Sequence, residues 1–83
     1  MKKYIIEKTR EIIMEVLENV NITGEQYNVD LNELGMDSLA FIQMVVMLEE
    51  EFNIEFPDLK LQISEMNTLD KIVEIVCNEK LKE

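Results

Sequence analysis

The chain has 83 residues, 47% of them apolar, with two glycines and one proline, which fits one small globular helical domain and excludes a disordered chain. Eighteen acidic residues against eight basic ones give a net charge of −10, so neither nucleic acid nor an anionic membrane surface is an expected partner. We expect partner proteins with basic surfaces, since attraction between opposite charges would speed their encounter.

The first predicted element is an amphipathic helix over residues 2 to 20. Its apolar residues return to one face of a 3.6-residue helix, and they are Ile5, Ile6, Ile12, Ile13, Val16, Leu17 and Val20. Asn19, Asn21 and Gly24 indicate its end.

Residues 21 to 37 form a predicted loop with Asn, Thr, Gly and Asp punctuation. Val29, Leu31 and Leu34 alternate with polar residues, but the sequence offers no partner strand, so we expect them to pin the loop onto the helices. A loop of this length in a compact domain usually has internal packing or a function. Here it would set the angle at which the following residues are presented.

The stretch at 34–39, LGMDSL, leads into the second predicted helix. Gly35 tolerates a positive φ at little cost, and Asp37 and Ser38 are both residue types that cap helix N-termini. Ser38 is therefore expected at a helix mouth, where unpaired N–H groups and the positive dipole end lie. A covalently attached phosphate would be favoured there by about 0.3–1 kcal/mol. From these residues alone, the alternative is that Ser38 only caps its helix.

The second helix is predicted over residues 38 to 52 and carries two apolar stripes. The first stripe consists of Phe41, Met44, Val45, Leu48 and Phe52. The second consists of Leu39, Ile42 and Val46. One stripe faces the core, and the other is either an exposed binding surface or a second buried side; the pattern leaves both open.

Three acidic residues, Glu49, Glu50 and Glu51, follow near the end of this helix, where negative charge opposes the helix dipole. Helix stability therefore does not explain them. We expect Glu49 and Glu50 to dock on basic patches of partners, and Glu51 to be solvated.

Two further helices complete the predicted fold. A short one opens at Pro57-Asp58 and extends to Ile63 or Met66, with Leu59, Ile63 and Met66 turned inward. Asn67 or Thr68 caps the last, which runs to about Lys80. Its expected apolar face is Leu69, Ile72, Val73, Val76 and Leu81. The predicted fold class is all-α, a four-helix bundle with three longer helices and a short one.

Other chemistry is set aside on spacing and composition. Residues 30–35 place Asp, Asn and Gly as in a calcium loop, but Leu34 and Phe41 stand where oxygen ligands are needed. Zinc-ligand spacing is absent, and without histidine no base of that kind can activate a serine nucleophile. Cys77 is interpreted as a small buried hydrophobe. We predict neither a metal nor an enzymatic activity.

The LGMDSL motif at 34–39, residues 48–58 (LEEEFNIEFPD) and the final amphipathic helix together resemble acyl and peptidyl carrier proteins. The resemblance implies one carrier domain over residues 1–83, with 4′-phosphopantetheine from coenzyme A attached to Ser38 by a phosphopantetheinyl transferase. Asp37, Met36 and Leu39 would surround the attachment site. The helix after the serine would recognise partners, through Leu39, Ile42 and Val46 together with Glu49 and Glu50.

Two departures from the family pattern concern the pathway. Fatty-acid carriers usually bear acids two and five residues after the serine, where this chain has Ala40 and Gln43, and residues 57–68 make a longer segment. Both favour a free-standing carrier for polyketide or nonribosomal peptide synthesis, with acyl- or aminoacyl-loading and condensing enzymes as partners. A fatty-acid carrier and a D-alanyl carrier are alternatives within the family. An acidic helical adaptor, with Ser38 only a cap, is the alternative from another class.

The expected setting is the bacterial cytoplasm. Cys77 is the single cysteine, so no internal disulfide can form and a reducing compartment is indicated. Charged residues interrupt the apolar run at the N-terminus, which is too short for a signal peptide, and no apolar stretch is long enough to span a membrane. We expect a monomer.

Overall fold

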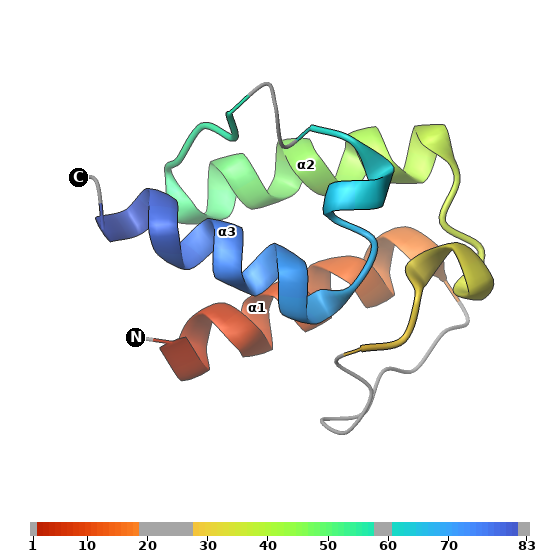
Figure 1. Ribbon diagram of the computed structural model, residues 1–83, viewed down its shortest axis with the longest axis horizontal. Coiled ribbons are helices and arrows are strands. Elements are labelled where there is room, and N and C mark those ends of the chain that lie inside the picture. The colour runs from red at the N-terminus through yellow and green to blue at the C-terminus, as the bar shows by residue number, and fades with distance from the viewer. Residues whose placement is uncertain (1, 19–27, 58–60, 82–83) are drawn as a thin grey trace.

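The computed structural model (Figure 1) describes residues 2–18, 28–57 and 61–81. In chain order its elements are α1 (Lys2–Leu17), the 3-10 helix η1 (Leu31–Leu34), α2 (Ser38–Phe52), the 3-10 helix η3 (Ile63–Glu65) and α3 (Leu69–Leu81). The described residues contain no strand, which confirms the all-α fold. The short fourth helix is only the single turn η3 within the described residues, and η1 was not predicted.

The three α-helices lie side by side, with α1 packed against both α2 and α3 and running opposite to them (Figure 1). Hydrogen bonds join both α1 and α3 to the C-terminal end of α2. The Tyr4 hydroxyl of α1 donates to Glu51 Oε2 at 2.6 Å, and the Lys80 ammonium of α3 donates to the Phe52 carbonyl at 3.1 Å. The opposite end of α2, where Ser38 lies, is left free of these ties.

The end of α2 is also closed by backbone geometry and by an aromatic contact. Asn53 adopts the left-handed conformation that ends the helix, with φ 53°, and its N–H donates to the Glu49 carbonyl. The Tyr4 ring meets Phe52 edge to face at 6.0 Å. The hydrogen bond to Glu51 raises the Tyr4 pKa above 10.0, since it favours the protonated phenol, with burial and nearby carboxylates adding to the effect.

The buried residues of α2 confirm the first apolar stripe predicted from the helical period. All five members of the first α2 stripe, Phe41, Met44, Val45, Leu48 and Phe52, are buried. Ile5, Ile12 and Ile13 of α1 pack against them in the same core. Among the described residues, none of the helices α1, α2 and α3 could span a membrane.

The last helix departs from the prediction at its end. Leu81 was assigned to the apolar face but is 83% exposed, because it lies at the terminus of α3 where no neighbouring helix covers it. Ile75 is buried instead, and Cys77 is half-buried beside the core, not enclosed in it. Residues 19–27 and 58–60, which include Val20, Gly24 and Leu59, lie outside the described residues.

Thr9 of α1 gives a stability prediction, because it is fully buried and its Oγ1 has no hydrogen-bond partner among the described residues. An unsatisfied buried hydroxyl costs about 1–3 kcal/mol. Thr9→Val, which nearly keeps the shape, should raise the free energy of unfolding in urea by about 1 kcal/mol.

Thr68→Val is the matched control and should have the opposite sign. The Thr68 hydroxyl accepts the Lys71 N–H at 3.1 Å and caps α3, so its loss should cost about 1 kcal/mol. If both substitutions destabilise the chain, the hydroxyl of Thr9 is satisfied and the prediction is wrong.

Candidate functional site

The loop that precedes α2 is fixed by the turn η1. The Asp30 carboxylate accepts the Asn32 N–H at 2.9 Å and caps η1. The Leu31 N–H donates to the Asn67 carbonyl at 2.7 Å, and the Leu31 side chain is buried in the core. The bond from Leu31 joins the loop to the residues just before α3, so the position of the loop is fixed before the chain reaches Ser38. The bond between Asp30 and Asn32 stabilises the turn itself.

Gly35 bends the chain out of η1 with φ 105° and ψ 8°. A Cβ placed there would meet no atom within 4 Å, so the backbone conformation, not lack of space, favours glycine. The next residue returns to the core, since the Met36 N–H donates to the Leu31 carbonyl at 3.0 Å and its side chain is only 6% exposed. Met36 therefore anchors the bend, and its side chain does not line an open site.

Asp37 is the N-cap of α2. Its carboxylate accepts the Ala40 N–H and its carbonyl accepts the Phe41 N–H, both at 2.8 Å. Ser38 is the first residue of the helix, and its side chain is exposed. This corrects the alternative in which Ser38 only caps its helix, because Asp37 already holds that position.

The arrangement suits a phosphate on the Ser38 oxygen. The first N–H groups of an α-helix have no carbonyl partner within the helix. Of these groups in α2, the Asp37 carboxylate accepts the N–H of Ala40. The N–H groups of Ser38 and Leu39 therefore face the helix mouth, where the dipole also favours negative charge.

Asp37→Ala tests the cap. The loss of its bond to Ala40 should lower the free energy of unfolding by about 1 kcal/mol, while Asp37→Asn should cost only a few tenths because Asn is also a strong cap. Urea denaturation of the three proteins measures both effects. Equal stability of Asp37→Ala and the wild type would contradict the cap assignment.

The second apolar stripe of α2 lies on the surface. Leu39 is 67% exposed, Ile42 59% and Val46 46%. Of the two possibilities that the pattern left open, burial of α2 on a second side is therefore wrong. That this stripe contacts partners stays a prediction.

The acidic residues at the end of α2 are placed differently from one another. Glu49 is half-buried, and its carboxylate accepts the Phe56 N–H at 3.0 Å, holding the segment that follows α2. This contact gives Glu49 a structural role that the sequence analysis did not predict, while docking of Glu49 on partners stays a prediction. Glu51 is exposed but bonded to Tyr4, so it is not merely solvated. Glu50 is exposed and is the best placed of the three for a partner.

The sequence gives little indication of two of these roles, the N-cap at Asp37 and the hydrogen bond from Phe56 to Glu49. Asp37 and Ser38 are neighbours of equal capping preference, so the position of the cap depends on where the helix begins. The bond of Glu49 reaches seven residues ahead, past a left-handed residue, and no short-range pattern predicts it.

Comparison with known proteins supports a common ancestry over nearly the whole chain. Residues 7–76 match the family model described as "Phosphopantetheine attachment site". The chain is 35% identical to the acyl carrier protein of Buchnera aphidicola (Acyrthosiphon pisum strain 5A) over 96% of its own length and 98% of that protein. It is 36% identical to the acyl carrier protein homolog of Mycoplasma genitalium, over 82% of this chain and 88% of that protein. The mitochondrial acyl carrier protein of Neurospora crassa is 40% identical over 58% of this chain and 34% of its own length.

Proposed function

The chain belongs to the phosphopantetheine-binding acyl carrier family, and from that premise we propose that Ser38 is its attachment residue. Members of this family are carriers and not catalysts, and their prosthetic group is 4′-phosphopantetheine. The proposed function is to hold acyl groups at Ser38 and to present them to partner enzymes, starting with the phosphopantetheinyl transferase that supplies the group from coenzyme A.

The observation that carries the proposal is the exposed Ser38 hydroxyl at the first position of α2. The Gly35 bend and the Asp37 cap hold it there, so the chain orients the attachment point without covering it. When bound, the group would supply a terminal thiol that holds acyl cargo as a thioester. In this proposal Asp37 orients the site, Leu39 flanks it on the surface and Met36 supports it from the core.

Intact-mass analysis tests this proposal. The wild-type chain, incubated with coenzyme A and a broad-specificity phosphopantetheinyl transferase, should gain one phosphopantetheinyl group, and peptide mapping should place it on Ser38. A well-studied carrier protein in the same reaction controls for transferase activity. An unmodified chain beside a modified control would overturn the assignment.

We also propose that partners dock on the exposed stripe of α2, formed by Leu39, Ile42 and Val46, with Glu50 as its acidic neighbour. Exposed apolar side chains next to charge favour binding, and a net charge of −10 favours basic partners. Glu49 contributes less in this proposal because its carboxylate is bonded to Phe56.

For the cargo we propose a specialised acyl product, such as a polyketide or peptide intermediate, made in the bacterial cytoplasm. The support is the lack of charge at Ala40 and Gln43, where fatty-acid carriers usually bear acids. The relatives are named acyl carrier proteins, which favours a polyketide over a peptide intermediate and keeps a fatty-acid role as the alternative.

Gln43→Glu tests the pathway proposal. Gln43 is exposed on α2, so the added charge should improve the use of this carrier by a bacterial fatty-acid malonyltransferase about tenfold in kcat/KM. Gln62→Glu, with the same charge change at an exposed position far along the chain, should have little effect. If the wild type is already used as well as a fatty-acid carrier, the specialised role is wrong.

A further inference from the structure

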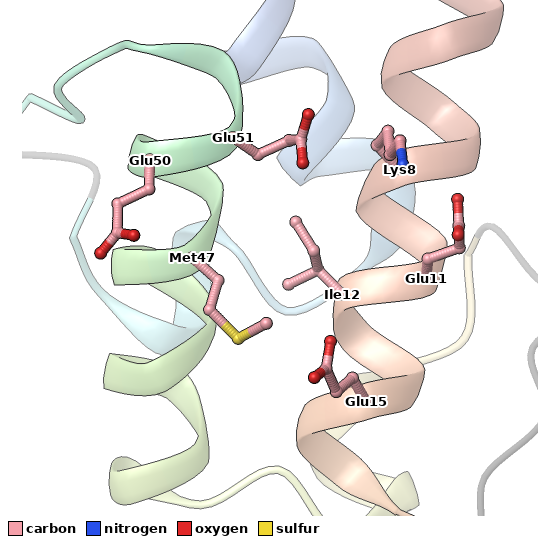
Figure 2. Close-up of a pocket in the computed structure, with 7 residues that line it drawn as sticks. All are labelled: Lys8, Glu11, Ile12, Glu15, Met47, Glu50 and Glu51. Atoms are coloured by element: carbon pink, nitrogen blue, oxygen red, sulfur yellow. The ribbon is translucent and has the colours of Figure 1, made fainter.

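A groove runs between α1 and α2 and has no part in the attachment site. It consists of two adjoining hollows of about 370 and 460 Å³ that share Glu15 of α1 and Met47 of α2. Figure 2 shows Met47 and Ile12 pointing toward one another across the first hollow, with Glu15 beside them. We call the whole feature the α1–α2 groove.

The groove combines an apolar lining with an acidic rim. Ile12, Val16, Met47 and the exposed residues Ile42 and Val46 supply the apolar side chains. Met47 has a flexible thioether that adapts its shape to a bound side chain.

The rim carries exposed carboxylates of α1, from Glu11, Glu15 and Glu18. Among the described residues that line the first hollow, Lys8 is the one lysine, and Figure 2 shows it on α1, across from Glu51 on α2. Among the described residues that line the second hollow, on the side of Ile42, none is basic. The field in the groove is therefore negative, most clearly toward the Ile42 end.

We propose that the α1–α2 groove binds a basic amphipathic helix of a partner protein. Two antiparallel helices form a groove of the kind that accepts a third helix, whose apolar face would fill it while Lys or Arg residues reach the carboxylates of the rim. A second copy of this chain, with its own charge of −10, would be repelled. Anionic lipid would be repelled for the same reason.

The proposal deepens the carrier function and rests on it. Ile42, which lines one end of the groove, is four residues after Ser38 and so lies on the same face of α2. A helix seated in the groove would therefore have one end next to the attachment point. The proposal also extends partner recognition from α2 alone to α1, which supplies the other wall.

A titration followed by ¹⁵N–¹H NMR tests the groove on the full chain. The probe is a synthetic helical peptide of leucine and lysine, about five turns long with its leucines on one face. It should shift amide signals of α1 and α2 along the groove and bind through a 1:1 complex. A peptide of the same composition with its leucines scrambled around the helix should bind at least about tenfold more weakly.

Charge reversal separates the groove from general attraction. Glu15→Lys should weaken peptide binding about tenfold, and Glu15→Gln by a smaller factor, which keeps the test open if the lysine variant is unstable. Glu74→Lys, an equal charge change at an exposed position on α3, should change Kd less than about threefold. Equal weakening by Glu15→Lys and Glu74→Lys would overturn the proposal, as would equal binding of the scrambled peptide.

The modification of wild-type Ser38, measured separately by intact mass, distinguishes two kinds of failure. If the chain is modified but the peptide ignores the groove, only the groove proposal fails. If the chain is not modified, the carrier assignment fails whatever the peptide does.

Discussion

Ser38→Ala should leave the chain folded and wholly unable to accept phosphopantetheine. The hydroxyl is the attachment atom in the proposed function, so its removal allows no partial activity. Because Asp37 caps α2 and the Ser38 side chain is exposed, the free energy of unfolding should change by less than about 0.5 kcal/mol. Intact mass after reaction with coenzyme A and transferase, together with urea denaturation, measures both parts.

Ser64→Ala is the matched control. Ser64 is the only other serine in the sequence, and it is also exposed, on η3. It should be modified as fully as the wild type. A phosphopantetheinyl group on the Ser38→Ala protein would show that the group is attached elsewhere, while unfolding of that variant would show a structural role that the geometry does not suggest.

Leu48→Ala should destabilise the chain far more than the substitutions at Asp37, Ser38 or Ile42. Leu48 is completely buried, and truncating a buried leucine typically costs about 2–5 kcal/mol through lost burial and the cavity left behind. A small domain has a total stability of only about 5–15 kcal/mol, so much of the margin would be lost. Urea denaturation and the loss of dispersed amide signals measure the effect.

Ile42→Ala is the matched control for Leu48→Ala, because it differs from it in the burial of the side chain. It truncates an aliphatic side chain on the same helix, but Ile42 is 59% exposed, so the cost should be within about 0.5 kcal/mol. It should instead weaken partner binding, because Ile42 belongs to both the exposed stripe and the α1–α2 groove. If Ile42→Ala destabilises the chain as much as Leu48→Ala, the stripe is core and not surface.

The bounds of α2 and its buried stripe could be predicted because they depend on local rules. A helix has a period of 3.6 residues, so the spacing from Phe41 to Phe52 fixes one face. The break at Gly35 and the end at Asn53 follow from which residues adopt the left-handed conformation most readily. The exposure of the second stripe could not be predicted in this way, because the pattern alone is equally compatible with burial of α2 on a second side.

Other features could not be predicted because they depend on contacts between distant residues. The turn η1 is held by the bond from Leu31 to Asn67, and Met36 is buried because that turn directs it inward. The structural role of Glu49 could not be predicted because its partner is the backbone N–H of Phe56, which no side-chain pattern indicates. Leu81 fits the helical period, but the period does not say where the neighbouring helices stop.

The ties at the end of α2 have a practical consequence for handling the protein. Tyr4 and Lys80, near the two ends of the described chain, are both bonded to the last residues of α2, whereas Ser38 begins that helix. Both described ends of the chain thus lie at the end of the molecule away from Ser38, the proposed attachment residue (Figure 1). A purification tag, a fluorescent label or a surface linker joined at either end would leave the hydroxyl facing solution, so immobilised protein can be loaded and assayed in place.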